Sequence, residues 1–465
     1  MKSFHILRVS IIVIVQFYCF CSKTGDTTLA TFKGGSVLIN EYVEYFFSST
    51  RYQKDVVPDE ENLKHIVTLK ALEKIAVLEA LEQDIDQDSV YIESYENNLR
   101  KTLFYRYMRQ EIINKVITDS LIEKFYRNYT PQYHMSYIMR PVPRSSPASL
   151  EETQKDTIEF VYKLLENGRD FEDLAKKYSQ DITTNPKGGS LGFVIRESMG
   201  DAALRATMDT LADFSWSAPI RGFEGYYILY KGEKREVPVP PLDEIRDKIW
   251  QTLYRTRRHD IEKVLDVRFE DLSTKYNYTP NETLIENVLI KAGADSASTL
   301  ASDLDFERLS EKDMGEALAT YDDGYIKVYE LFEEKNRVPG NKLEFKERLE
   351  TLSQRHLLSK HAIELGYQDL QDIKEKMEDV RESLLRSFLH RRNVIDVAKV
   401  RLETIEETKV QGDSSEPDQF RRVRMERRLR EEFEEKLKRK YNFRFVGKNF
   451  AAALEVAKGE KLGEN

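Results

Sequence analysis

Residues 171–199, FEDLAKKYSQDITTNPKGGSLGFVIRESM, decide the fold of the segment around them. Phe171, Leu174, Ala175 and Tyr178 recur at helical spacing at its start. A polar turn follows, and the pair Gly188-Gly189 then leads into a short apolar run. We therefore predict a short helix, a tight turn and a strand in this order.

The flanking sequence extends this pattern to a small α+β domain. Strands are predicted at residues 133–139, 191–195, 216–220 and 226–231, and helices at 150–167, 171–178 and 201–211. Gly168 closes the first of these helices as a C-cap signal.

The motifs Y-S-x-D and G-G-x-L-G-x-F in this stretch resemble the signature of the parvulin family of peptidyl-prolyl isomerases. The resemblance covers residues 133–235 and implies a small antiparallel sheet with flanking helices. It also implies rotation about X-Pro bonds, whose barrier is about 18–20 kcal/mol. That reaction needs an apolar pocket and organised hydrogen bonds, so we expect no cofactor and no metal.

The same resemblance assigns the site residues one by one. The family's central acid falls on Asp181, and its two histidines fall on Tyr137 and Tyr227, so phenols replace imidazoles. The expected substrate-binding residues are Leu191, Phe193, Met199 and Met208. The family's pocket phenylalanine falls near Ala203, where Met208 or Phe214 would supply the missing bulk. Two interpretations stay open: a slow or altered isomerase, and a proline-recognition or structural domain.

The sequence before this block is helical after a short β-hairpin. Residues 29–39, LATFKGGSVLI, predict the hairpin, and residues 59–128 show helical periodicity. This order resembles the N-terminal module of the SurA and PrsA class of exported chaperones, in which helices surround a cradle for unfolded clients. The aromatic residues that would line such a cradle, or else belong to the core, are Tyr42, Tyr45, Phe46, Phe47, Phe104, Tyr105 and Tyr107.

The second half of the chain repeats the first without the block. Residues 318–328 align with residues 29–39 without gaps, and K-Y-N-F at 440–443 matches K-Y-N-Y at 275–278. We predict one long helix at 242–275, a helix at 419–440 and a frayed tail from 447. The predicted fold is mostly α, α+β, with helical chaperone modules and an inserted parvulin-like domain. The predicted segments are a signal at 1–21, a module at 22–130, the parvulin-like domain at 131–236, its completing helix at 237–290 and a second module at 291–465.

Composition excludes several function classes. The net charge of -9 argues against a general nucleic-acid binder. The two cysteines, Cys19 and Cys21, lie near the start, which leaves no disulfide framework and no cysteine metal site in the rest of the chain. His356 and His361 are five residues apart on a charged helix, which we interpret as a solvated surface rather than a metal site.

The N-terminus predicts export. Lys2 and Arg8 precede an apolar run of about a dozen residues, which suits a signal peptide better than a span of about 20. Cys21 at the end of this run resembles a lipoprotein cleavage site, and a lipid there would attach the protein to a membrane. Plain secretion and an uncleaved anchor are the alternatives.

We therefore expect a folding factor of the periplasm or cell envelope that binds unfolded or proline-containing client chains. Its catalytic residues would be Asp181, Tyr137 and Tyr227. The alternatives are a holding chaperone with an inactive proline-binding domain, and a structural envelope lipoprotein.

Overall fold

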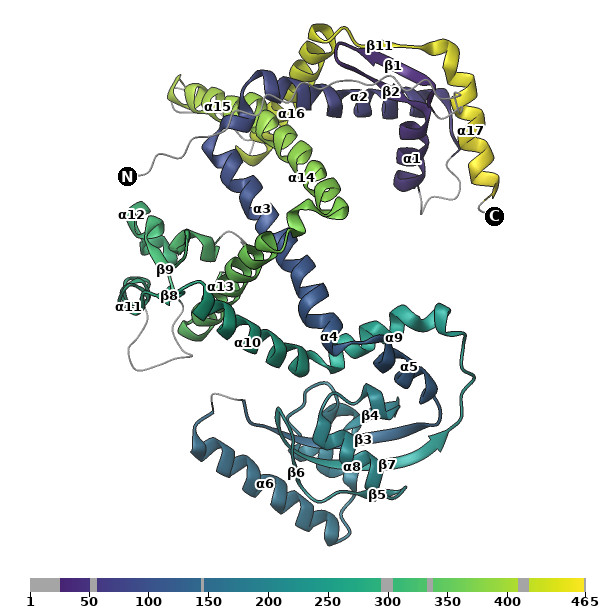
Figure 1. The fold of residues 1–465 in the computed structure, drawn as a ribbon, viewed down its shortest axis with the longest axis vertical. Coiled ribbons are helices and arrows are strands. Elements are labelled where there is room, and N and C mark those ends of the chain that lie inside the picture. The colour runs from purple at the N-terminus through teal and green to yellow at the C-terminus, as the bar shows by residue number, and fades with distance from the viewer. Residues whose placement is uncertain are drawn as a thin grey trace. The chain divides into compact units, whose positions relative to one another are not determined.

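The computed structural model describes residues 26–50, 57–143, 146–293, 304–332, 338–408 and 418–463. The predicted signal segment, Cys21 and the polar break at 412–417 lie outside the described residues. The chain divides into two compact units (Figure 1). The terminal unit contains residues 1–99 and 371–465, and the central unit contains residues 100–370. Both are mostly helical with small antiparallel sheets, which confirms the predicted fold class.

The terminal unit is built around a three-stranded sheet with the order β11-β1-β2. Its strands are β1 (Thr28–Phe32), β2 (Gly35–Leu38) and β11 (Arg444–Phe445). Its helices are α1 (Ile39–Thr50), α2 (Glu60–Glu82), the first part of α3 (Ser89–Tyr107), α14 (Gln371–His390), α15 (Asp396–Thr408), α16 (Asp418–Lys440) and α17 (Phe450–Gly463). The tail was expected to fray, but α17 buries Phe450, Ala453 and Ala457 in the core of this unit.

The central unit contains a second three-stranded sheet with the order β10-β9-β8. Its strands are β8 (Thr279–Pro280), β9 (Ala317–Tyr321) and β10 (Gly324–Lys327). The accompanying helices are α4 (Asn114–Val116), α5 (Asp119–Arg127), α9 (Leu242–Thr256), α10 (Arg258–Lys275), α11 (Glu282–Lys291), α12 (Glu311–Gly315) and α13 (Lys342–Glu364).

The two three-stranded sheets have the same topology, and each is accompanied by an equivalent set of side-chain contacts. In the terminal unit, Lys440 and Tyr441 bind Glu82 at 2.5 and 3.2 Å. In the central unit, Lys275 and Tyr276 bind Glu364 at 2.7 and 2.8 Å. The asparagine that follows each tyrosine has a φ of 51°. The long helices that carry the two glutamates, α2 and α13, both contain 23 residues. These matched contacts support the interpretation of an internal repeat.

The pairing of the repeats is crossed. β11 lies at the end of the second half, and it pairs with β1 of the first half, with Ala30 opposite Phe445. β8 lies at the end of the first half, and it pairs with β9 of the second half, with Thr279 opposite Thr320. This differs from the predicted division, in which residues 237–290 complete the first module and 291–465 form the second. The Lys-Tyr pair and its glutamate are the same in both halves. The sequence match therefore does not indicate which hairpin is completed by the strand after α10 and which by the strand after α16.

Two further expectations are corrected. The predicted helix at 242–275 is interrupted at Arg257, where α9 ends and α10 begins. His356 was expected on a solvated surface, but it is 2% exposed. Its ring nitrogens bind Glu330 at 2.8 Å and Tyr321 at 2.9 Å, because the second hairpin covers this face of α13.

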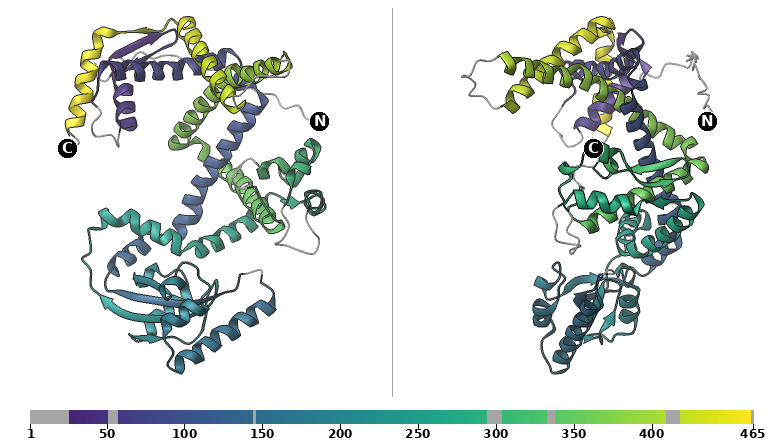
Figure 2. Two further views of the ribbon diagram at one scale, coloured as in Figure 1. Left: turned by 180° about the vertical axis from the view of Figure 1, so that it is seen from behind. Right: turned by 90° about the vertical axis from the view of Figure 1, so that its left-hand side faces the viewer.

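The parvulin-like block forms a five-stranded sheet with the order β4-β3-β7-β5, and β6 also pairs with β7. Its strands are β3 (Gln132–Pro141), β4 (Ser190–Val194), β5 (Ser215–Trp216), β6 (Ile220–Arg221) and β7 (Gly225–Arg235). Its helices are α6 (Ala148–Glu166), α7 (Phe171–Tyr178) and α8 (Ala202–Thr210). The three helices and the strands β3, β4 and β7 were predicted from the sequence, but the single strand predicted at 216–220 is two short strands, β5 and β6. Figure 2 shows this block, in blue and teal, from two further directions.

Within the described residues, no helix combines the length and apolar character that a membrane crossing requires. The same residues contain no group of three or more His, Cys, Asp or Glu side chains placed to hold a metal ion.

The crossed pairing predicts the behaviour of a cut chain. If a protease site is inserted between residues 293 and 304 and cleaved, we expect the two fragments to co-elute in gel filtration. Each fragment supplies strands and helices to both units, so neither fragment can form a complete unit without the other. Fragments that separate into two folded monomers would contradict the crossed pairing, and the uncut chain with the same insertion is the control.

Candidate functional site

The loop between α7 and β4 places Asp181 next to the central strand β3. The amide of Gln180 donates to the carbonyl of Met139 at 2.9 Å, and the amide of Tyr137 donates to the carbonyl of Gly189 at 3.0 Å. Gly189 has a φ of +79°, and a Cβ there would lie 2.2 Å from the carbonyl oxygen of Tyr137. Only glycine allows this close approach of loop and strand. The glycine pair of the motif thus brings the acid to the strand.

Asp181 accepts hydrogen bonds from three groups. The Tyr137 hydroxyl and the Thr184 hydroxyl each donate to Oδ2 at 2.6 Å, and the amide of Thr183 donates to Oδ1 at 3.0 Å. The structure therefore brings together two of the predicted site residues. Thr184 was not among the predictions, although its position three residues after an aspartate is typical of a local side-chain bond.

These contacts fix the protonation states of the pair. Burial opposes the ionisation of Asp181, but the hydrogen bonds from Thr184, Tyr137 and Thr183 hold its pKa below the ordinary aspartate value. Burial, with the Asp181 carboxylate as acceptor, raises the pKa of Tyr137 well above its usual range. At neutral pH the pair is a carboxylate that accepts from a neutral phenol.

Tyr227 on β7 lies beside this pair. Its ring meets the ring of Tyr137 edge to face, with centroids 5.6 Å apart. Its hydroxyl forms no hydrogen bond within the part of the chain that the structure describes. Burial raises the pKa of Tyr227 far above its usual range, so the phenol is a neutral donor. This side chain therefore has a free O–H next to the Asp181–Tyr137 pair.

An apolar cluster adjoins the three polar residues. Met199 and Met208 are 5% and 3% exposed, and Leu191 packs on the same cluster. Met135, Leu204 and Leu229 complete its buried part. Met208 thus lies where the sequence predicted a replacement for the missing phenylalanine. Phe214 does not, because it is 68% exposed.

Phe193 is a correction, because it lies away from this cluster. Leu191 is an extra residue in the pairing of β4 with β3: Gly192 opposes Met135, and Ser190 opposes Ser136. This bulge shifts the alternation of side chains, so Leu191 and Phe193 point to different faces. Phe193 instead contacts His134 and lines a cavity of about 250 Å³ with Phe125 and Ile249.

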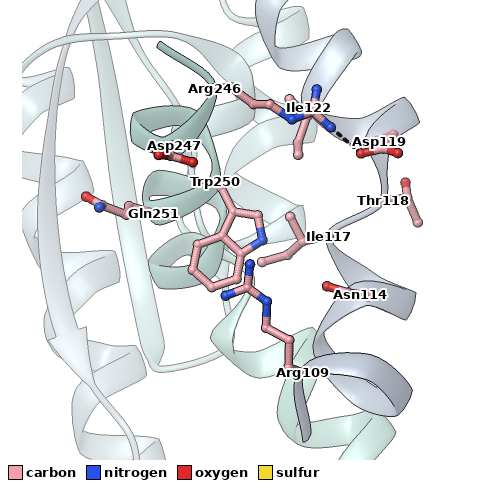
Figure 3. Close-up of a pocket in the computed structure, with 10 residues that line it drawn as sticks. All are labelled: Arg109, Asn114, Ile117, Thr118, Asp119, Ile122, Arg246, Asp247, Trp250 and Gln251. Carbon is pink, nitrogen blue, oxygen red and sulfur yellow. Dashed lines mark hydrogen bonds and ion pairs between the residues drawn. The ribbon is translucent and has the colours of Figure 1, made fainter. Parts of the chain in front are cut away.

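A second cavity, of about 560 Å³, lies outside the parvulin-like block (Figure 3). Its floor is Trp250 on α9, whose ring lies 4.5 Å from the guanidinium carbon of Arg109 and is stacked on Tyr254. Arg246 and Asp119 form an ion pair at its edge. Its other lining residues are Asn114, Ile117, Thr118, Ile122, Asp247 and Gln251. No sequence signal other than the rarity of tryptophan pointed to this cavity.

The aromatic residues expected to line a client cradle or to belong to the core differ in their exposure. Tyr42 and Phe46 are fully buried, and Tyr107 is 1% exposed, so these three belong to the core. Tyr105 is 61% exposed and is available to contact other molecules.

Comparisons with known proteins agree with this geometry. A family model described as "Rotamase: PPIC-type PPIASE domain" matches residues 137–233. Foldase protein PrsA 2 of Bacillus cereus is 24% identical over 304 residues, which cover 60% of this chain and 94% of that protein. Foldase protein PrsA of Clostridium kluyveri is 29% identical over 176 residues, which cover 35% of this chain and 49% of that protein.

A solved structure of peptidylprolyl isomerase (PrsA) from Bacillus anthracis is also similar. It is 19% identical with a TM-score of 0.28, and the match covers 43% of this chain and 94% of that one. The family match begins at Tyr137 and includes Asp181 and Tyr227. Residues 137–233 are therefore a PPIC-type peptidyl-prolyl isomerase domain of the parvulin type, within a chain that resembles the PrsA foldases.

Proposed function

We propose that the chain is a folding factor whose parvulin-type domain catalyses the isomerisation of X-Pro bonds in unfolded client proteins. The observation that carries this is the free hydroxyl of Tyr227 beside the Asp181–Tyr137 pair and the apolar cluster. The proline ring would occupy the cluster around Met199 and Met208. Tyr227 would donate to the twisted amide, which loses its resonance during rotation and accepts a hydrogen bond more readily at its nitrogen.

The Asp181–Tyr137 pair would act electrostatically. A carboxylate held by three donors keeps its position while the peptide rotates, so no reorganisation is needed during the reaction. The reaction moves no proton, and the residues need only a constant charge and a fixed geometry. A protease-coupled assay with a proline peptide tests the proposal on the whole chain, and a rate equal to the uncatalysed one would overturn it.

We also propose that the cavity around Trp250 binds client segments and gives the chain a holding function. Tryptophan and arginine are the side chains that most often dominate binding at protein surfaces, and both meet here. A holding chaperone that does not isomerise is the alternative function that this cavity supports.

Export and lipid attachment at Cys21 are the remaining parts of the proposal. They rest on the basic and apolar pattern of residues 1–21. Unfolded client chains in the cell envelope would then be the partners. Incorporation of a palmitate analogue tests the anchor, and a chain that takes up no label would exclude it.

The protonation states predict a pH profile. Asp181 stays charged above its lowered pKa, and both phenols stay neutral below their raised pKa values. We therefore expect kcat/KM for a proline peptide to be constant from about pH 5.5 to about pH 9. A step within that range would contradict the assignment of these three residues. As a comparison, the double variant Tyr137→His, Tyr227→His should acquire a step near pH 6.5.

The Trp250 cavity predicts a separate effect on holding. Trp250→Ala removes the floor of the cavity, so suppression of aggregation of an unfolded client should need a roughly ten-fold higher protein concentration. Trp216→Ala is the matched control, because Trp216 is 38% exposed on β5 and lies outside the cavity. Equal suppression by the two variants and the wild type would exclude the cavity as a client site.

A further inference from the structure

The junction of α9 and α10 contacts the loop that carries Met199. Arg257 at this junction is 6% exposed. Its Nη1 donates to the carbonyl oxygen of Met199 at 3.1 Å, and its Nη2 donates to the carbonyl oxygen of Glu197 at 3.2 Å. Met199 belongs to the apolar cluster of the candidate site, whereas Arg257 lies outside the family match at residues 137–233.

A second guanidinium holds the same loop from inside the domain. Arg205 on α8 donates to the carbonyl oxygens of Met199 and Gly200 at 2.8 and 2.9 Å. The Met199 carbonyl thus accepts from two arginines. Burial and the neighbouring charge of Arg205 lower the pKa of Arg257 to about 10, so the group is still charged at neutral pH. A buried charge is costly unless hydrogen bonds compensate it, so the loop carbonyls are required partners for Arg257.

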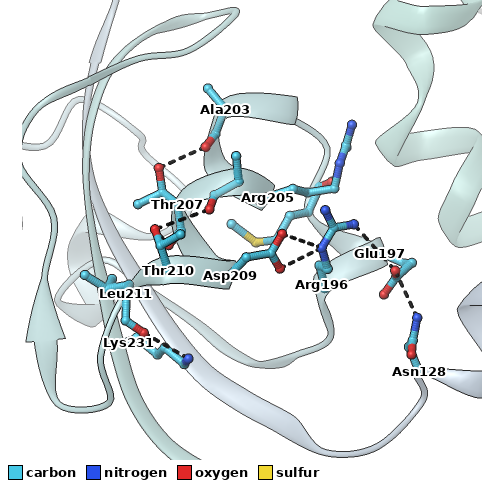
Figure 4. A network of polar contacts seen from close by, with 12 residues as sticks. Asn128, Arg196, Glu197, Ala203, Arg205, Thr207, Asp209, Thr210, Leu211 and Lys231 are labelled. Carbon is cyan, nitrogen blue, oxygen red and sulfur yellow. Dashed lines mark hydrogen bonds and ion pairs between the residues drawn. The ribbon is translucent and has the colours of Figure 1, made fainter.

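The turn before Met199 is also tied to the helical region through Glu197 (Figure 4). Glu197 is 1% exposed, and its Oε1 accepts from Asn128 at the end of α5 at 3.2 Å. Arg196 lies 3.6 Å from the same oxygen and forms an ion pair with Asp209 on α8 at 2.7 Å. The segment before Met199 is therefore held by α5, α8 and the α9–α10 junction together.

The same junction reaches the loop on the other side of the cluster. The ring of His259 on α10 stacks on Phe223, with centroids 3.4 Å apart. The preceding residue, Gly222, packs against Tyr227, since a Cβ there would lie 2.8 Å from the Tyr227 ring. Arg257 and His259 thus contact the two loops that carry Met199 and border Tyr227.

We infer that the α9–α10 junction sets the shape of the proline pocket, with Arg257 as a positioning residue for Met199. The inference rests on the proposed function for the meaning of the pocket, but not for the contact itself. Isomerisation by this domain therefore depends on a side chain from the helical part of the chain. The interruption of the helix at Arg257 turns that side chain toward the loop.

The test uses the whole chain with isotope-labelled methionine methyl groups, and the Met199 signal is assigned with Met199→Leu. In Arg257→Ala we expect the Met199 signal to move, KM for a proline peptide to rise roughly ten-fold and kcat to change less. Arg257→Lys, which keeps the charge and one donor, should restore part of the effect. Arg258→Ala is the matched control, because the neighbouring Arg258 side chain is 83% exposed and pairs with Glu262 on the surface.

An unmoved Met199 signal in Arg257→Ala would overturn the inference. The signal of Met314, which packs against the core around β9 and β10 in the central unit, reports whether the unit that carries the substitution folds. If Arg257→Ala does not fold, Arg257→Gln, which fills more of the space but removes the charge, gives the same readout, and an unmoved Met199 signal in that variant would overturn the inference. A wild-type chain that neither binds nor isomerises the peptide would refute the proposed function, while the Met199 signal would still decide the role of Arg257.

Discussion

The hairpins β1-β2 and β9-β10 each depend on a third strand that comes from the other half of the chain. A two-stranded hairpin is marginally stable alone, and the returning strand with its Lys-Tyr pair supplies the missing contacts. Tyr441 is 3% exposed and binds both Glu79 and Glu82, so these groups satisfy each other inside the unit. The entropic cost of closing such a long loop grows only slowly with its length, so strands far apart in the chain can pair without a large loss of stability. The pairing explains why β1 and α1, near the start of the described residues, share one core with α17, near their end.

The parvulin-type domain is inserted between two helices of the central unit that lie side by side. Helix α5 enters the domain and α9 leaves it, and these two helices pack against each other. The loop that carries Met199 contacts Arg257 at the end of α9, and Phe223 stacks on His259 of α10. The proposed reaction also makes few chemical demands on the side chains of the pocket. In the proposed function, rotation about an X-Pro bond needs no proton transfer, so two neutral phenols and a carboxylate would supply a constant electrostatic frame.

The interruption between α9 and α10 shows how tertiary contacts override local periodicity. Ile249 and Leu253 before this point and Ile261 and Leu265 after it lie on one helical stripe, which predicts one helix. Burial of the Arg257 guanidinium against two loop carbonyls favours a break, because that buried charge would otherwise lack these hydrogen-bond partners. Similarly, the bulge at Leu191 places Phe193 on the opposite face of the sheet, where it lines a cavity together with Ile249.

Signals in the sequence are sufficient for most elements of the inserted domain, for the position of Asp181 and for the internal repeat. Glycine pairs, helix caps and apolar spacing are local signals, and they act within a few residues. The family motif also carries Leu191 and Met199, whereas Met208 was expected only as one of two replacements for the phenylalanine missing near Ala203. Tertiary contacts decide which hairpin β8 and β11 each complete, which side chain holds Met199 and where Phe193 lies. Those outcomes depend on contacts between residues far apart in the chain, and the Lys-Tyr and glutamate groups that make them are chemically alike in both repeats.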